Sequence, residues 1–186
     1  MRSADTRDRI TTAVRELLAE GAFHESTMEQ VADRAGVSRA TLYLHFRSRL
    51  ELVDAICETF DQNPALLRLR EIVESPDAEE ALEDTIAGSM AFWSSEDAVL
   101  RHIYGVASVD PSAQDLIDRQ RADRRSELER LVRNLARTGR LRNERRALSL
   151  LLMLTSYDTF RELRAAGLSD RQVTTTLQQA ARDLLY

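Results

Sequence analysis

Cysteine, proline, glycine and aromatic residues are all scarce in this chain of 186 residues. It has one cysteine, three prolines and six glycines, and aromatic residues make up 5% of it. The single Cys57 excludes an intramolecular disulfide and is typical of a reducing compartment. The longest apolar run, residues 147–154, is too short to cross a bilayer, and residues 1–10 lack the apolar segment of a secretory signal. We therefore expect a cytoplasmic protein without a membrane segment.

Motifs of the common enzyme classes are also missing from the sequence. It contains no glycine-rich phosphate loop, no pair of cysteines or histidines at metal-binding spacing, and no G-x-S-x-G nucleophile motif. Cys57 lies near an apolar helical stripe, which favours a packed thiol over a nucleophile. We therefore predict that the chain is not an enzyme, has no catalytic residues, and needs neither a metal nor another cofactor.

Charge is distributed unevenly along the chain, although the net charge is only −5. Residues 1–50 contain eight arginines and seven acidic residues, whereas residues 51–186 contain 18 arginines and 24 acidic residues. The acidic excess therefore lies in the second part. Because a DNA duplex attracts a local basic patch whatever the total charge is, this distribution allows a DNA-binding head on an acidic body.

Apolar residues recur at helical spacing throughout, and no segment alternates with a period of two. Helix formers such as Ala, Leu, Arg and Glu dominate a composition with 43% hydrophobic and 31% charged residues. We predict an all-α fold, in which an N-terminal head of three short helices is joined by a fourth helix to a helical-bundle body. The predicted helices cover residues 6–20, 27–36, 38–45, 48–60, 64–74, 77–93, 95–104, 110–139, 143–166 and 169–184. Residues 64–74 form either a short helix or an extension of the helix before it. Ser48 and Glu51 are spaced as a capping box, and Asp77 is expected to cap the helix that follows it.

Residues 27–52 carry the most informative pattern. Thr27 and Gln30 are spaced as a capping box at the start of a helix, Gly36 allows a tight turn, and a second short helix starts at Ser38. This arrangement is a helix-turn-helix, in which the first helix supports the second and the second faces the major groove of DNA.

The two faces of the second short helix differ in chemistry. Val37, Leu42 and Phe46 are apolar and are expected to pack inward. A groove-reading helix needs donors that reach base edges and small residues that let the backbone approach. The residues left on the outer side meet both needs: Ser38, Arg39, Ala40, Thr41, Tyr43 and His45.

This segment resembles the DNA-binding head of the TetR/AcrR family of bacterial regulators. The family shows a Thr-capped helix, A-x-x-A-G-V-S, a small residue, T-L-Y-x-H-F and then a basic residue. The resemblance extends over about residues 6–60, including Gly21 and Phe23 after the first helix, and beyond them rests on the helical layout. The matching positions are Thr27, Ala32, residues 35–38, Ala40, residues 41–43, His45, Phe46 and Arg49.

The resemblance implies that Arg39, Ala40 and Thr41 face bases, whereas the phosphate contacts fix the register on the duplex. The residues implied to hold phosphates are Thr27, Tyr43, His45 and Arg49. With Ser38 at the start of the second helix, these eight positions are the predicted DNA-binding residues.

Three positions depart from the family pattern. Arg49 stands where lysine is usual, which keeps the charge but changes its geometry. Leu50 replaces a common glutamate and Leu44 a polar or aromatic residue, and both bear on operator preference. The alternative is a plain helical hairpin with Tyr43 and His45 on its surface, and His45 by itself fits a buried, hydrogen-bonded histidine equally well. Because the cap, the turn and the outward polar positions agree, we favour DNA binding.

The resemblance also implies that the last two helices of two chains form a four-helix interface. Residues 147–163 are apolar over more than one face, which indicates a helix covered on two sides. Ala180 and Ala181 permit close approach on the last helix. A helix buried within a monomer is the alternative. We favour a homodimer, because a helix-turn-helix gains specificity from two half-sites about 34 Å apart.

In the family, a ligand pocket lies between the middle helices of the body and the first interface helix. Core packing is the alternative for each candidate, since pockets and cores are both apolar. An anionic effector would need an arginine such as Arg121 or Arg125. The arginine-dense residues 119–146 include acidic partners at i, i+4, which indicates a solvated helix face. The predicted ligand-binding residues are Met90, Trp93, His102, Tyr104, Met153, Tyr157 and Phe160.

We predict a ligand-responsive DNA-binding regulator, with the helix-turn-helix domain in residues 1–50 and the ligand-binding and dimerisation domain in residues 51–186. The expected partners are a double-stranded pseudo-palindromic operator, a small-molecule effector and a second copy of the chain. The first hypothesis is a repressor released by its effector. The alternative is a helical dimer that acts through protein contacts with a non-functional head, and an activator role stays open.

Overall fold

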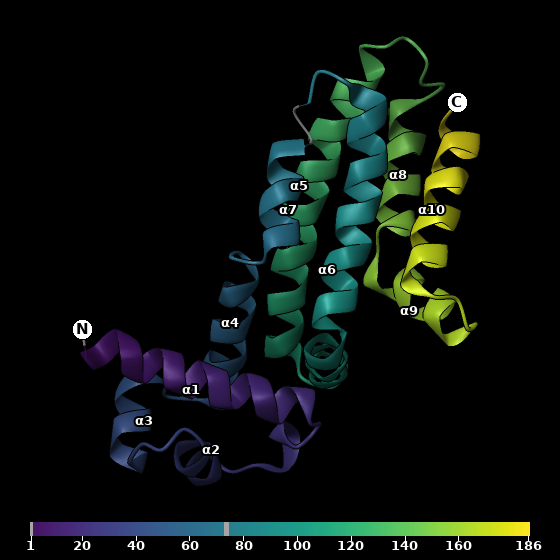
Figure 1. The fold of residues 1–186 in the computed structure, drawn as a ribbon. Helices are drawn as coiled ribbons and strands as arrows, with labels where there is room; N and C mark the ends of the chain where they lie inside the picture. Colours follow the sequence, from purple (N-terminus) through teal and green to yellow (C-terminus); the bar gives the residue numbers. More distant parts are fainter. Residues whose placement is uncertain (1, 73–74) are drawn as a thin grey trace. The chain divides into compact units, whose positions relative to one another are not determined.

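The structure, a computed structural model, describes residues 2–72 and 75–186. Over these ranges the chain forms ten α-helices, one 3-10 turn and no strand, which confirms the predicted all-α fold (Figure 1). None of the helices in the described part is long and apolar enough to cross a membrane. The chain packs as two compact units: unit 1 is residues 1–61 with 96–119, and unit 2 is residues 62–95 with 120–186.

Unit 1 contains the predicted head and segments of two long helices. The predicted domain boundary after residue 50 divides the chain by function. By packing, residues 51–61 belong to the same unit as the predicted head. The apolar sides of the head helices form its interior, where Ile10, Leu42 and Ile56 are fully buried. Its elements are α1 (Arg2–Ala19), the 3-10 turn η1 (Phe23–Glu25), α2 (Met28–Arg34), α3 (Arg39–His45), α4 (Arg49–Phe60), the end of α6 (Ala78–Ala107) and the start of α7 (Pro111–Ala136).

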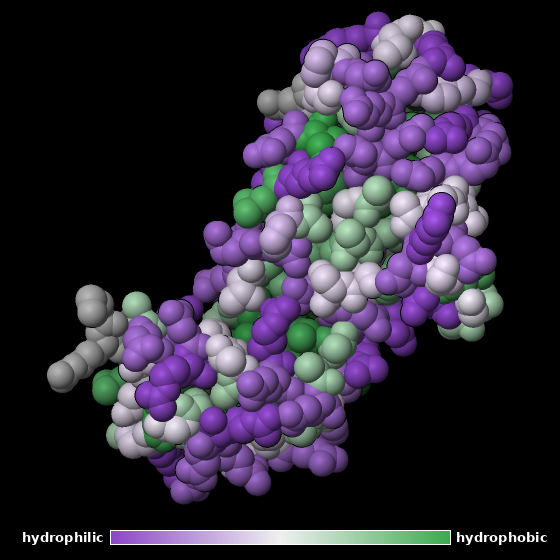
Figure 2. All heavy atoms as spheres, viewed as in Figure 1, coloured by the Kyte–Doolittle hydropathy of each residue, from purple (hydrophilic) through white to green (hydrophobic). Residues whose placement is uncertain are grey.

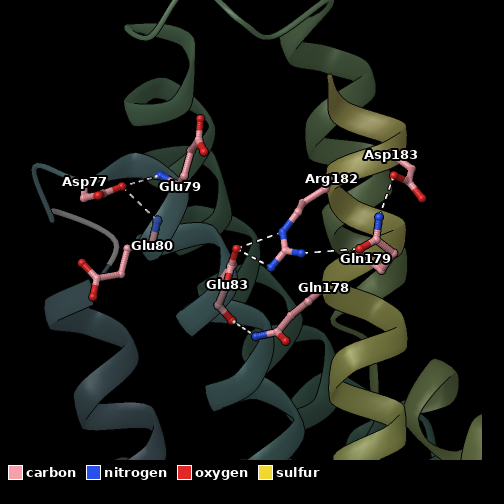
Figure 3. Close-up of polar contacts among 8 residues, drawn as sticks. All are labelled: Asp77, Glu79, Glu80, Glu83, Gln178, Gln179, Arg182 and Asp183. Atoms are coloured by element: carbon pink, nitrogen blue, oxygen red, sulfur yellow. Dashed lines mark hydrogen bonds and ion pairs between the residues drawn. The ribbon is translucent and has the colours of Figure 1, made fainter.

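Unit 2 contains the rest of α6 and α7 together with the C-terminal helices. Asp77 caps α6 as predicted, because its Oδ1 accepts hydrogen bonds from the backbone N–H groups of Glu79 (3.1 Å) and Glu80 (3.0 Å) (Figure 3). Its further helices are α5 (Pro64–Ile72), α8 (Glu144–Leu154), α9 (Tyr157–Ala165) and α10 (Asp170–Leu185). On the face drawn in Figure 2, hydrophilic residues cover most of the surface, with smaller hydrophobic areas between them.

Polar contacts attach α10 to α6 along one side. The Arg182 guanidinium lies 2.5 Å from Glu83 Oε1, and Gln178 Nε2 donates to the Glu83 backbone oxygen at 3.1 Å (Figure 3). Val173 and Leu177 are buried within the same chain, as is Ala181, which was expected at a dimer interface. One flank of α10 is therefore used inside the protomer.

Two predicted helix boundaries are wrong. Ser95 was expected to begin a new helix, but its Oγ donates to the Phe92 backbone oxygen (2.9 Å) and α6 continues to Ala107. Conversely, the predicted helix 143–166 divides into α8 and α9, and Ser156 Oγ accepts from the Thr159 N–H at 3.1 Å. The apolar stretch 147–163 therefore belongs to two helices, which weakens the expectation of a single helix covered on two sides.

Smaller differences concern helix ends. Helix α1 begins at Arg2, four residues before the predicted start. The predicted helix 64–74 is observed as α5, and residues 73 and 74 lie outside the described part. At α4, Ser48 Oγ accepts from the Glu51 N–H (3.2 Å) as expected, but the Glu51 carboxylate accepts from the Arg47 N–H (2.7 Å). The cap at Ser48 is confirmed. In a capping box Glu51 would accept from the Ser48 N–H, but here it accepts from the N–H of Arg47, the residue before the cap.

The break between α8 and α9 is held by side chains of α6 and α7. Trp93 Nε1 donates to the Thr155 backbone oxygen at 2.9 Å. Arg124 Nη1 donates to the Leu152 backbone oxygen (3.2 Å) and to Thr155 Oγ1 (3.1 Å). Thr155 is itself fully buried. Because the last carbonyls of a helix lack partners within that helix, these donors stabilise α8 where it ends.

Cys57 is a buried residue of α4, as expected for a structural thiol. Burial, followed by the negative charge of Asp54, raises the pKa of the thiol to about 12. A raised pKa leaves the group protonated at neutral pH, and the thiol form is a poor nucleophile.

We expect Cys57 to react with iodoacetamide at pH 8 at least about a hundredfold more slowly in the native chain than in the urea-unfolded chain, because only the thiolate reacts. Mass spectrometry of alkylated protein measures both rates. Equal rates for the folded and unfolded chains would contradict the burial of this thiol.

Candidate nucleic-acid interface

Helix α3 is oriented by the side chains on its inner face. Leu42 is fully buried and Phe46 is 1% exposed, as predicted, while Val37 is half-buried. The outer face carries the predicted DNA-binding side chains. Of these, Ser38, Arg39, Ala40 and Tyr43 are exposed, and Thr41 and His45 are half-buried.

The turn between α2 and α3 needs a left-handed residue, and Gly36 provides it with φ +64°. The Val37 N–H donates to the Ala32 backbone oxygen at 3.0 Å, as in a Schellman motif. Arg9 on α1 donates from Nη2 to the backbone oxygens of Ala35 (2.8 Å) and Gly36 (2.7 Å). Helix α1 is therefore bonded directly to the turn that sets the direction of α3.

Two hydroxyls of the candidate interface are helix caps. Thr27 Oγ1 accepts from the Gln30 N–H (3.2 Å), and Gln30 Oε1 accepts from the Thr27 N–H (2.8 Å), which confirms the capping box. Ser38 Oγ accepts from the Thr41 N–H at 3.0 Å. A hydroxyl that accepts at a cap still has its own O–H to donate. Thr27 can therefore cap α2 and donate to a phosphate oxygen together.

Arg39 and Tyr43 lie one turn apart on the outer face. The Arg39 Cζ is 5.6 Å from the centre of the Tyr43 ring, a cation–π contact that holds both side chains over α3. The neighbouring Leu44 is 85% exposed. An exposed apolar side chain at this place suits the methyl group of thymine. The sequence pattern marked Leu44 only as a departure from the family.

Most arginines of the head bind partners within unit 1. Arg7 pairs with Glu58 (3.0 Å), and Arg34 pairs with Glu16 and Glu20 of α1. Arg15 pairs with the buried Glu96 of α6. Together with Arg9 and Arg49, they brace the head. Arg39 and Arg47 are exposed, and Arg47 was missed because its position before the Ser48 cap indicated only a helix start.

Arg49, predicted to contact phosphate, points into the head. Its guanidinium donates to the backbone oxygens of Phe23 and Ser26, and its Cζ lies 4.4 Å from the centre of the Phe23 ring. Burial lowers the pKa of this guanidinium. These contacts attach the start of α4 to η1, directly before Thr27. In this structure Arg49 positions the start of α2, and its phosphate contact stays a prediction.

Comparison with known proteins agrees with this geometry. The family described as "Bacterial regulatory proteins, tetR family" matches residues 10–56, which contain the helix-turn-helix. The regulator UidR of Escherichia coli is 42% identical over 69 residues, which cover 37% of this chain and 35% of UidR. Residues 10–56 therefore match the DNA-binding head of the TetR family.

Further relatives show how far the TetR likeness extends. The repressor BepR of Brucella suis is 26% identical over 97 residues, 51% of this chain and 46% of BepR. The alignments thus span about a third to a half of these relatives. A crystal structure of a TetR-family protein from Rhodococcus RHA1 has a TM-score of 0.74, with 19% identity over 97% of this chain and 96% of that one. The whole chain therefore has the fold of this TetR-family structure.

Part of the predicted ligand set meets in unit 2. The rings of Trp93 and Tyr157 are 5.4 Å apart, and those of Tyr157 and Phe160 are 6.3 Å apart. Met90 is buried, whereas Met153 is 52% exposed. His102 and Tyr104 belong to unit 1 instead, and both are half-buried.

The arginines proposed for an anionic effector lie on the solvated face of α7. Arg121 is exposed, and Arg125 pairs with Glu129 at 3.0 Å with i, i+4 spacing. The predicted solvated face is thereby confirmed. Arg124 bonds the break after α8, next to Trp93, and the sequence pattern did not distinguish it from its neighbours.

Replacing Arg49 with Ala should lower the free energy of unfolding by about 2 kcal/mol, because two backbone oxygens lose a charged donor. Arg49→Lys should lose about half as much, since an ammonium cannot reproduce the fork of donors. Arg47→Ala, a change at an exposed arginine two residues away, should cost less than about 0.5 kcal/mol.

Urea denaturation followed by circular dichroism measures these differences. If Arg49→Ala unfolded at the wild-type urea concentration while DNA binding was lost, Arg49 would act on phosphate rather than on the head.

Proposed function

We propose that this chain is a dimeric transcriptional repressor that binds an operator through the outer face of α3 and is released by a small ligand. The observation that carries this proposal is the orientation of α3. Its apolar face is buried at Leu42 and Phe46, and its outer face presents Arg39, Ala40 and Tyr43. A cytoplasmic location follows from a chromosomal operator. The repressor BepR supports the direction of regulation by likeness.

The outer residues divide into two roles. Arg39 has the donors to read a guanine edge, and Ala40 lets the backbone approach the bases. Ser38 and Thr41 supply hydroxyls beside them, with their oxygens 2.8 Å apart. The phosphate contacts are assigned to Thr27, Tyr43, His45 and Arg47, while Arg49 bonds the backbone oxygens of Phe23 and Ser26 within the head. Since several of these donors are neutral, we expect a modest dependence on salt.

A dimer is supported by apolar residues that the protomer leaves uncovered. Ala180 is half-buried and Leu184 is 38% exposed on α10, four residues apart on one side. On α8, Leu150 is half-buried and Met153 is 52% exposed. These residues flank the buried stripes of both helices. A second copy that covers them would bury them and pair two recognition helices.

The effector is assigned to the ring cluster of unit 2. Trp93 and Tyr157 contact each other beside the break between α8 and α9, and Arg124 bonds the same break. A ligand that prefers one arrangement of this break shifts the population of body conformations. If that arrangement gives the two α3 helices of the dimer a separation that does not match successive major grooves, the dimer leaves the operator and repression is relieved.

To test the interface, duplexes selected from a random pool are titrated with variants of α3. Arg39→Ala should weaken binding by about 1–3 kcal/mol per half-site and relax the sequence preference at one position, because a bidentate base contact is lost. Arg47→Ala should weaken all duplexes equally and reduce the salt slope by about 1 per half-site.

Arg137→Ala removes an exposed arginine outside the head and serves as the matched control. Selection of no duplex above background by the wild-type chain would favour a regulator that acts through protein contacts.

To test the dimer, Leu184→Glu places a charge on the uncovered side of α10. The variant should elute at the mass of one chain in size-exclusion chromatography with light scattering, while the wild type elutes as two. Thr175→Glu is the control, because it lies nine residues before Leu184 and thus on the opposite side of the helix. A wild-type chain that is monomeric at micromolar concentration would overturn the proposed assembly.

A further inference from the structure

A pocket of about 290 Å³ lies within unit 1, where residues at the end of α1, in η1 and near the end of α6 meet. Its apolar lining includes Leu18, Phe23, Val106 and Val109. Leu18 and Phe23 are buried, whereas Val109 is 83% exposed. The residues of the pocket differ from those of the ring cluster in unit 2.

A glycine of α6 lines this pocket without packing against a neighbour. Gly105 lines it in a helical conformation, and a Cβ at this position would meet no heavy atom within 4 Å. Gly88 of the same helix is different, because a Cβ there would lie 2.8 Å from Leu69 Cδ2. Packing therefore explains Gly88 but not Gly105. Position 105 can therefore take a small side chain without a clash, whereas a large side chain there would occupy space in the pocket that Gly105 lines.

The rim of the pocket combines a fixed positive charge with two imidazoles. Arg101 is exposed and donates to the Ala19 backbone oxygen at 3.4 Å. His102 lies against Gly21, where a Cβ would be 2.9 Å from its Cε1 and where φ is +76°. Burial, followed by the charges of Arg101 and His24, lowers the pKa of His102. The lowered pKa favours the uncharged form of His102, and Arg101 supplies the positive charge at the rim.

We propose that this pocket binds a small amphiphilic carboxylate, with its apolar part between Phe23 and Val106 and its carboxylate at Arg101. An apolar cavity with one charged group at its mouth is selective for such a molecule. Each water takes about 30 Å³ in the liquid, so the volume fits roughly ten non-hydrogen atoms. Octanoate has this size and charge. Binding at this pocket does not require an operator.

The pocket shares a residue with the brace behind the DNA-binding face. One side of Phe23 lines the pocket, and its ring lies 4.4 Å from the Arg49 guanidinium. Arg49 also bonds the Ser26 backbone oxygen, directly before the Thr27 cap of α2. A ligand that moves Phe23 thus acts on the start of α2.

Histidine ring signals in NMR spectra of the full-length chain provide the readout. The sequence has three histidines, of which His24 and His102 line the pocket and His45 lies on α3. Titration with octanoate should shift the signals of His24 and His102 and leave His45 unchanged. No shift at any histidine would overturn the proposal, and equal shifts at all three, the sign of general detergent action, would do the same.

Variants at two positions separate the pocket from its charge. Gly105→Phe should fill the pocket and weaken octanoate binding at least tenfold, whereas Gly105→Ala should stay within about threefold of the wild type. Arg101→Gln should weaken octanoate about tenfold and leave 1-octanol unchanged, because a charge-assisted contact is lost. Circular dichroism confirms that each variant is folded. Unchanged octanoate affinity in Gly105→Phe would place the ligand elsewhere, and DNA binding of the wild-type chain is measured separately.

Discussion

Helix α3 has seven residues, which is too short for a helix to be stable in water by itself. It depends on the burial of Leu42 on its inner face and of Phe46, the residue directly after its last turn. Because those two side chains enter the interior of the head, Arg39 and Tyr43 must point outward. The hydroxyl cap at Ser38 and the left-handed turn at Gly36 fix where α3 begins. The chemistry of the outer face is available to DNA only while this burial holds.

Most arginines of the head make their contacts within the head. Arg9 bonds the turn before α3, Arg34 bonds α1, and Arg49 bonds η1. Each of these contacts lies behind or beside the outer face of α3, so stability and DNA recognition share the same few residues. Charge-assisted bonds to backbone oxygens are among the stronger contacts in a small domain. Phe23 connects these contacts to the pocket, because its ring lies against Arg49 and it also lines the cavity.

Local signals predicted the helices well and their breaks poorly. The caps at Thr27 and Ser48 were predicted correctly, because a hydroxyl and the N–H group that it accepts from lie within three residues of each other. Ser95 and Ser156 carry the same local signal, but only Ser156 begins a helix. The difference comes from residues distant in sequence, since Trp93 and Arg124 bond the carbonyls around the second break.

The sequence alone determined the helical class, the helix-turn-helix and the outward residues of α3, because caps, turns and the period of apolar residues act within one or two turns. Only the tertiary structure decided that Arg49 points inward, since its partners Phe23 and Ser26 are more than twenty residues away. It also decided that Gly105 lines a pocket while Gly88 serves packing. Two helical glycines look alike in a sequence, and the space beside each depends on which helix lies opposite.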